Sequence, residues 1–241
     1  MCAALTGSRR TALARGSISS MSAMPFSTVL RVPPVSWMLK TRRFSPSLRW
    51  PVASQAFRDA GANVASDYGV FFFVKADSTG GVLLEVCETT MPNDPYDRAG
   101  GWSPQVGTGH ASSVLRLDHI ACVTQEIEKA VAFFTGAVDG EVLVDERTEL
   151  PQPGRRVLLQ IGDTRVAFIQ PDDTAYGPLG AFLGKQQNGI YALVWQIADE
   201  AQARGHFDKL SLRQTAEGCV SPGFAIDPED FLGARHEFVV G

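Results

Sequence analysis

Two features that would mark a membrane protein or a disulfide-rich protein are missing from this sequence of 241 residues. No long uninterrupted apolar run occurs, whereas a helix needs about 20 apolar residues to cross a bilayer. The cysteines are few and scattered, and none forms a C-x-x-C pair: Cys2, Cys87, Cys122 and Cys219. This spacing disfavours a disulfide framework or a zinc cluster, and it indicates reduced thiols in a cytoplasmic location.

Acidic residues are absent from positions 1–50, which are rich in serine and arginine. These positions hold eight basic residues, whereas residues 51–241 hold the other 14 of the 22 basic residues and all 26 acidic ones. An acidic body binds polyanions poorly, so nucleic acid is not an expected partner. Residues 1–50 are predicted to be a disordered leader. Their composition fits a transit peptide to the mitochondrial matrix, or an artefact of a wrong start codon or an upstream frameshift.

Residues 51–89 carry the pattern of one helix followed by short strands. An amphipathic stretch at 52–60 is followed by Gly61, a residue suited to the end of a helix. Strands are then predicted at 63–66, 68–74 and 82–87. One helix with three strands is only part of a layer and cannot close a core alone. Its missing partner should lie upstream, but residues 1–50 offer nothing suitable.

Residues 116–241 form a second unit, separated from the first by a glycine- and proline-rich linker at 90–115. Strands are predicted at 117–123, 141–147, 155–161, 164–170, 189–197, 211–215, 223–227 and 234–240. Helices are predicted at 124–138, from Pro178 and at 199–210. The order of one strand, one helix and three strands occurs twice, in units of about 60 residues. This repetition predicts an α+β fold of paired βαβββ modules.

Four short motifs in the two units are similar to one protein family. They read LDHIA at 117–121, GAFLGK followed by NGI at 180–190, GARHE at 233–237 and STGGVLLE at 78–85. In these motifs the chain resembles the vicinal oxygen chelate (VOC) superfamily, which includes glyoxalase I and the bleomycin-resistance proteins, and most closely the methylmalonyl-CoA epimerases. The resemblance implies an open curved sheet, a complete domain at 116–241 and an N-terminally truncated first domain at 51–89.

The resemblance also implies a site for one divalent metal ion (Co, Ni, Zn, Mn or Mg) inside the sheet. Such an ion polarises a substrate carbonyl and eases removal of a neighbouring proton. By analogy with the family, the metal ligands here are His119, Glu237 and, in the first domain, Glu85, and Glu237 is also the catalytic candidate. The two middle ligand positions correspond to Ala167 and Ala192. Alanine cannot coordinate a metal, so the implied ligand set is incomplete.

The epimerases use one further carboxylate on the third strand, and its position corresponds to Val157 in this sequence. Strand alternation places Leu117 and His119 on one face of the first strand. The same alternation turns Tyr191 away from the face that carries Ala192. A shift of one residue in register would reverse each of these assignments.

Each candidate ligand also has a structural interpretation. A single histidine in a strand is commonly a hydrogen-bonded structural residue, and this alternative holds for His119. A buried carboxylate needs a partner, and Arg235 or His119 could neutralise Glu237 without a metal. Glu85 could be solvated if its half-domain has no partner module.

Two functions therefore remain open. One is an enzyme that uses a metal for proton transfer next to a carbonyl of a small acyl or thioester substrate, with isomerase or lyase ancestry. The other is a catalytically degenerate domain that acts as a small-molecule-binding or scaffold module without bound metal. A homodimer that completes the half-domain is compatible with either function.

Overall fold

The computed structural model describes residues 30–31, 50–69, 71–87, 110–162 and 164–241. The predicted leader lies almost entirely outside these residues, as does most of the predicted linker. The N-terminal part contains β1 (Leu30–Arg31), α2 (Trp50–Asp59), β2 (Val64–Ala65), β3 (Phe71–Val74), the 3-10 helix η1 (Ala76–Ser78) and β4 (Leu84–Cys87). None of the described helices is long and apolar enough to span a membrane.

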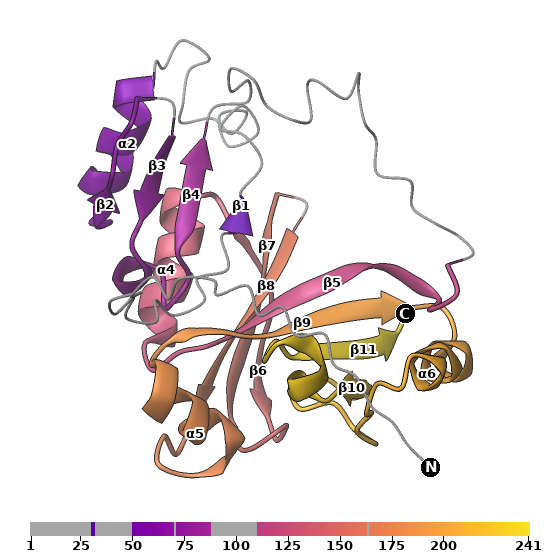
Figure 1. Cartoon of the computed structure of the whole chain (residues 1–241). Helices are drawn as coiled ribbons and strands as arrows, with labels where there is room; N and C mark the ends of the chain where they lie inside the picture. The colour runs from indigo at the N-terminus through magenta and orange to yellow at the C-terminus, as the bar shows by residue number, and fades with distance from the viewer. Residues whose placement is uncertain (1–29, 32–49, 70, 88–109, 163) are drawn as a thin grey trace, which may run out of the picture.

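The C-terminal part forms a seven-stranded sheet that contains two modules. The first module consists of β5 (Val114–Val123), α4 (Ile127–Ala137), β6 (Glu141–Thr148), β7 (Gly154–Ile161) and β8 (Thr164–Pro171). After α5 (Gly177–Gln186), the second consists of β9 (Gly189–Ile197), α6 (Glu200–Lys209), β10 (Phe224–Ile226), η2 (Pro228–Phe231) and β11 (His236–Val240). The strand order is β10-β11-β9-β5-β8-β7-β6 (Figure 1).

The two modules meet through their first strands, because β5 pairs antiparallel with β9 at the centre of the sheet. Within each module the first strand also pairs in parallel with the last, β5 with β8 and β9 with β11. The predicted α+β class with paired βαβββ modules is therefore confirmed. One predicted strand of the second module, at 211–215, is wrong: within it only Gln214 forms a bridge, to Ile226. The Gln214 side chain instead donates to α6, at the Arg204 carbonyl and the Asp208 carboxylate.

The N-terminal strands form a separate sheet with the order β1-β4-β3-β2. Here too the first strand pairs in parallel with the last, with Leu30 opposite Leu84 and Arg31 opposite Glu85. The same order, first-fourth-third-second, occurs in the module of β5 to β8. The sequence pattern did not predict β1, a strand of two residues that lies within residues 1–50. The N-terminal part thus has the element order and strand pairing of one βαβββ module.

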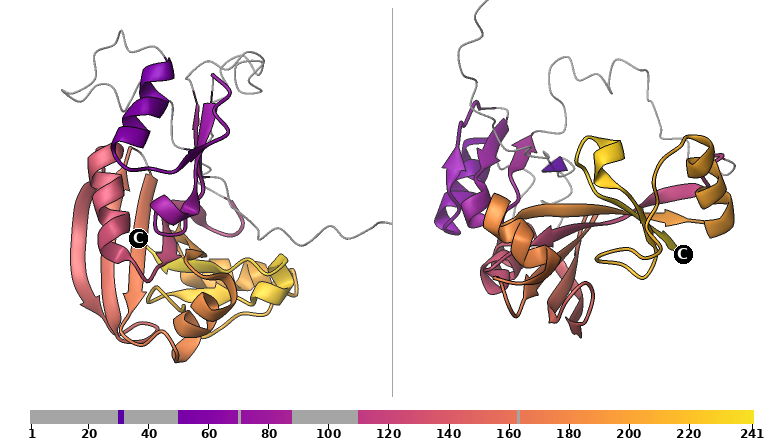
Figure 2. Two further views of the ribbon diagram at one scale, coloured as in Figure 1. Left: turned by 90° about the vertical axis from the view of Figure 1, so that its left-hand side faces the viewer. Right: turned by 60° about the horizontal axis from the view of Figure 1, so that its bottom comes forward.

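The N-terminal module and the larger sheet share one hydrophobic core. Phe57 of α2 packs edge-on against Phe72 of β3, with ring centroids 5.3 Å apart, and lies 6.1 Å from the ring of Phe133 of α4. The other members include Val74, Leu84 and Val86 of the N-terminal sheet, Phe134 of α4, and Ile120, Cys122, Val157 and Phe168 of the larger sheet. Figure 2 shows the N-terminal module lying along α4. Helix α4 is therefore covered on both sides, by its own sheet and by this module.

The opposite face of the larger sheet, called the inner face below, packs against α5. Its buried cluster contains Ala121, Val123, Ile169, Ala192 and Val194 from the strands, Leu179 and Leu183 from α5, and Val220 from the loop before β10. Helix α5 begins with Pro178 in its first turn, as predicted, and presents its leucines to the sheet. This face would hold the metal site implied by the resemblance.

Candidate functional site

His119 is buried on β5 and is bound through one of its two ring nitrogens. Its Nδ1 lies 2.7 Å from Oδ2 of Asp118, and the pKa of Asp118 is lowered mainly by this hydrogen bond. A carboxylate only accepts, so Nδ1 carries the proton and donates it. The other ring nitrogen, Nε2, is buried and has no hydrogen-bond partner among the described residues. One ring nitrogen of His119 is therefore left without a hydrogen-bond partner among the described residues.

Glu237 is fully buried on β11, and its carboxylate is bound by a loop of the same chain. Oε1 accepts from the backbone N–H of Cys219 at 2.8 Å. Oε2 accepts from the backbone N–H of Val220 at 3.0 Å and from the hydroxyl of Ser221 at 2.8 Å. Neither Arg235 nor His119, the partners considered from the sequence, supplies these hydrogen bonds.

His119 and Glu237 lie on either side of one residue of the central strand. His119 of β5 and Glu237 of β11 are both in register with Val194 of β9. Two strand spacings separate their backbones by roughly 10 Å. Glu85 lies on β4 in the other sheet, where it pairs with Phe73 and is half-buried. Within the described residues, no group of three or more His, Cys, Asp or Glu side chains is placed to hold a metal ion.

The two middle positions of the implied ligand set are occupied by packed alanines. Ala121 of β5 lies in register with Ala167 of β8 and with Ala192 of β9. All three are at most 2% exposed. Val157, where the resemblance implies a further carboxylate, packs in the shared core on the α4 side of the sheet, away from the inner face.

Two predicted side-chain directions are wrong, and strand irregularities explain both. The β5–β9 register shifts between Leu117 and His119, and Leu117 packs in the shared core, on the face opposite to the one expected. A second shift leaves Tyr191 without a partner on β5. Tyr191 then packs in the inner-face cluster beside Ala192 instead of turning away from it. Such irregularities change the facing of neighbouring residues and are not visible in a hydrophobic pattern.

The register shift at Tyr191 brings together polar residues that the sequence did not connect. The phenol oxygen of Tyr191 lies 2.9 Å from Sγ of Cys219, and the guanidinium of Arg235 lies 5.0 Å from the centre of the Tyr191 ring. Burial raises the pKa values of both the phenol and the thiol. Both groups are therefore neutral at physiological pH, which makes Cys219 a poor nucleophile.

The donors on the inner face do not fit a divalent metal. Structural and catalytic zinc sites use three or four protein ligands. His119 offers one nitrogen, the carboxylate of Glu237 is occupied by loop hydrogen bonds, and alanines stand at the other two positions. In the described part of the chain, the geometry supports no metal-dependent step at this face.

His236, next to Glu237, is directed to a different partner. Its Nδ1 accepts a hydrogen bond from Nε1 of Trp195 at 2.9 Å, and burial lowers its pKa below the ordinary value of 6.5. The acceptor nitrogen must be unprotonated, so the folded chain holds His236 in its neutral form.

This arrangement predicts an acid-sensitive contribution to stability. Because the pKa of His236 is lower in the folded state, the unfolded state binds protons first as the pH falls below 6.5. The contribution is therefore fully present above pH 6.5 and is lost as the pH falls through the lowered folded pKa. Chemical denaturation at several pH values should show that the free energy of unfolding decreases less on acidification in His236→Gln than in the wild type. His206→Gln serves as a matched control. If His236→Gln shows the same dependence of the free energy of unfolding on pH as the wild type, His236 is not the acid-sensitive group.

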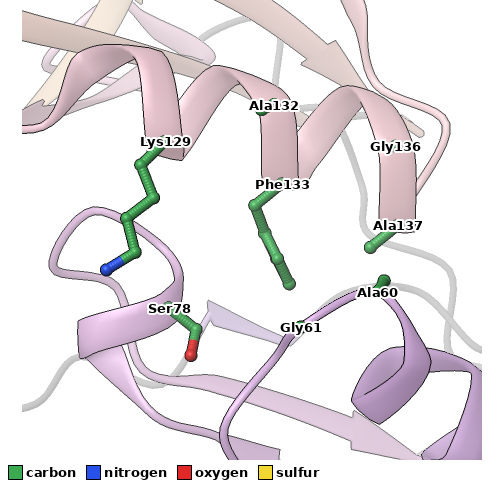
Figure 3. A pocket seen from close by; sticks show the side chains of 8 residues that line it. All are labelled: Ala60, Gly61, Ser78, Lys129, Ala132, Phe133, Gly136 and Ala137. Atoms are coloured by element: carbon green, nitrogen blue, oxygen red, sulfur yellow. The ribbon is translucent and has the colours of Figure 1, made fainter.

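A groove of about 310 Å³ lies between the N-terminal module and α4, away from the inner face. Figure 3 shows Lys129 extending from α4 toward the turn that carries Ser78, while Ala60 and Ala137 face each other at the opposite end. The Ser78 hydroxyl is already bound, since it accepts from the backbone N–H of Asn63 at 2.7 Å. The groove is therefore lined mostly by small apolar groups.

No protein-family profile matches the sequence, and no curated protein matches it. The structure resembles methylmalonyl-CoA epimerase from Mycobacterium tuberculosis, with 21% identity, 55% of this chain and 92% of that chain covered, and a TM-score of 0.49. It also resembles a Streptomyces coelicolor methylmalonyl-CoA epimerase variant in complex with 2-nitronate-propionyl-CoA, with 26% identity, 54% and 99% coverage, and a TM-score of 0.48. A hypothetical protein from Bacillus halodurans C-125 gives 18% identity, 52% and 94% coverage, and a TM-score of 0.47.

Epimerases are thus among the structural neighbours, as the sequence motifs predicted. All three TM-scores lie below 0.5. The chemistry of this chain therefore rests on its own residues.

Proposed function

We propose that this chain is a catalytically degenerate module with the paired βαβββ fold, which acts as a binding or scaffold protein without a resident metal. The observation that carries the proposal is the row of buried alanines, Ala167, Ala121 and Ala192, across the centre of the inner face. A site for a metal and a substrate needs polar donors and space at this location. The chain instead has buried methyl groups there, and those of Ala121 and Ala192 lie in the same cluster as Leu179 and Leu183 of α5.

Two further features support a scaffold role. Leu179 and Leu183 of α5 are buried against the inner face, together with Val220. On the other face, α4 forms a continuous core with the N-terminal module. The larger sheet therefore has apolar cover on both faces, and it uses one of them to hold a third βαβββ module in place.

One observation favours the alternative, metal-assisted proton transfer next to the carbonyl of a small acyl or thioester substrate. The Nε2 atom of His119 is buried and unpartnered among the described residues. Leaving a buried polar atom unsatisfied costs about 1–3 kcal/mol, and a bound metal ion would remove that cost. In this alternative, His119 and Glu237 would be ligands and the remaining coordination sites would need water or a partner chain.

Thermal unfolding with and without divalent ions separates the two functions. A ligand that binds only the folded state raises its stability, by about 2.7 kcal/mol at 100 times the dissociation constant. The scaffold function predicts the same Tm in EDTA and in Co²⁺, Ni²⁺, Zn²⁺ or Mn²⁺, and the same result for His119→Ala. A metal-dependent rise in Tm that His119→Ala abolishes would overturn it in favour of the enzyme.

A further inference from the structure

We infer that Glu237 is the anchor of the loop at 218–223, which closes the end of the inner face. This role differs from the metal-ligand role that the resemblance implies for the same residue. It also goes beyond the proposed function, because a loop anchor is compatible with a scaffold, a ligand-binding module or an enzyme whose metal is held elsewhere.

The loop is built to receive a carboxylate. It presents two consecutive backbone N–H groups, of Cys219 and Val220, and the hydroxyl of Ser221 to one side chain. Such oriented donors form an anion-binding concavity. Here the anion is a side chain of the neighbouring strand, so the chain binds its own carboxylate.

Glycines at both ends of the loop make this approach possible. A Cβ atom added to Gly218 would collide with Oε2 of Glu237 and with Ser221. A Cβ atom added to Gly223 would collide with the backbone carbonyl of Phe238, the residue after Glu237. The sequence GCVSPG at 218–223 therefore suits a loop that lies directly against β11 at Glu237.

The donor pattern requires an acceptor with two free oxygens. All the described hydrogen bonds at Glu237 are accepted by its oxygens, from Cys219, Val220 and Ser221. An ionised carboxylate is an acceptor only, whereas an amide directs one NH₂ group toward its partners. Glutamine at this position would place that group against a backbone N–H. The structure thus distinguishes Glu237 from its closest isostere.

Hydrogen exchange in the full chain tests this anchor. Glu237→Gln should increase amide exchange by at least about tenfold in a peptide covering residues 218–221, while peptides from β7 and β8 keep their protection. The Tm should fall by roughly 6–12 °C. Glu141→Gln, at an exposed position on the edge strand β6, is the matched control and should change neither quantity.

Two additional samples keep the test decisive. Ser221→Ala replaces Glu237→Gln if the latter does not fold. It removes only one donor and should give a smaller increase in amide exchange in the same peptide. Wild-type protein in EDTA should show unchanged exchange at 218–221. Normal protection of this peptide in folded Glu237→Gln would overturn the anchor, and so would loss of protection in EDTA, which would assign Glu237 to a metal. The proposed function fails on a different result, a metal-dependent Tm.

Discussion

Replacing Phe72 by alanine should destabilise the whole chain, with a loss of about 3–5 kcal/mol in the free energy of unfolding. Phe72 is completely buried on β3 and contacts Phe57, which in turn contacts Phe133 of α4. The cavity would therefore open inside the core that joins the N-terminal module to the larger sheet. We expect a single unfolding transition that moves as a whole in Phe72→Ala.

Tyr68→Ala provides the control for Phe72→Ala. Tyr68 lies just before β3 but is 62% exposed, so its removal should change the stability by less than about 1 kcal/mol. Circular dichroism and tryptophan fluorescence should report the same midpoint in each variant, because a shared core unfolds as one unit; the tryptophans include Trp50 of α2 and Trp195 of β9. Two separate transitions, with only the earlier one affected by Phe72→Ala, would contradict a shared core.

Introducing glutamate at Ala167 should destabilise the chain by at least about 3 kcal/mol, whether or not metal is present. The resemblance to the VOC superfamily implies Glu or Gln at this position, so the substitution would restore the implied ligand. In this chain, however, Ala167 is fully buried and in register with Ala121 and Leu158. A carboxylate placed there would lose its hydration without gaining a partner.

Ala132→Glu is the matched control for Ala167→Glu, because it makes the same change at an exposed helical alanine of α4. It should alter the free energy of unfolding by less than about 0.5 kcal/mol. Denaturant titrations with and without Zn²⁺ or Co²⁺ would compare the two variants. An Ala167→Glu protein that keeps its stability and binds one equivalent of metal would show that the inner face retains a metal cavity.

The modular fold was predictable from the sequence because its signal is local and repeated. The strand predicted at 189–197 coincides with β9, since apolar residues run continuously through a strand that is covered on both faces. The helix from Pro178 was predictable from the proline at its start. The packing of α4 between two layers was not predictable, because an amphipathic pattern does not indicate which distant module will cover a helix.

The site was less predictable than the fold, and the reasons are physical. The alanines at 167 and 192 already indicated that the middle ligands were missing. The register shift at Tyr191 could not be inferred, because a bulge residue does not interrupt the apolar pattern of a strand. The partners of Glu237 come from a loop 16 to 18 residues earlier in the chain. Only its glycines, Gly218 and Gly223, hinted at a close approach.

Metal content is the measurement that tests the central claim most directly. Wild-type protein and His119→Ala should be purified without chelators and analysed by inductively coupled plasma mass spectrometry against protein concentration. We expect both to contain well under one equivalent of any divalent metal, with no difference between them. One equivalent in the wild type that disappears in His119→Ala would contradict a metal-independent module and assign a metal centre to the inner face.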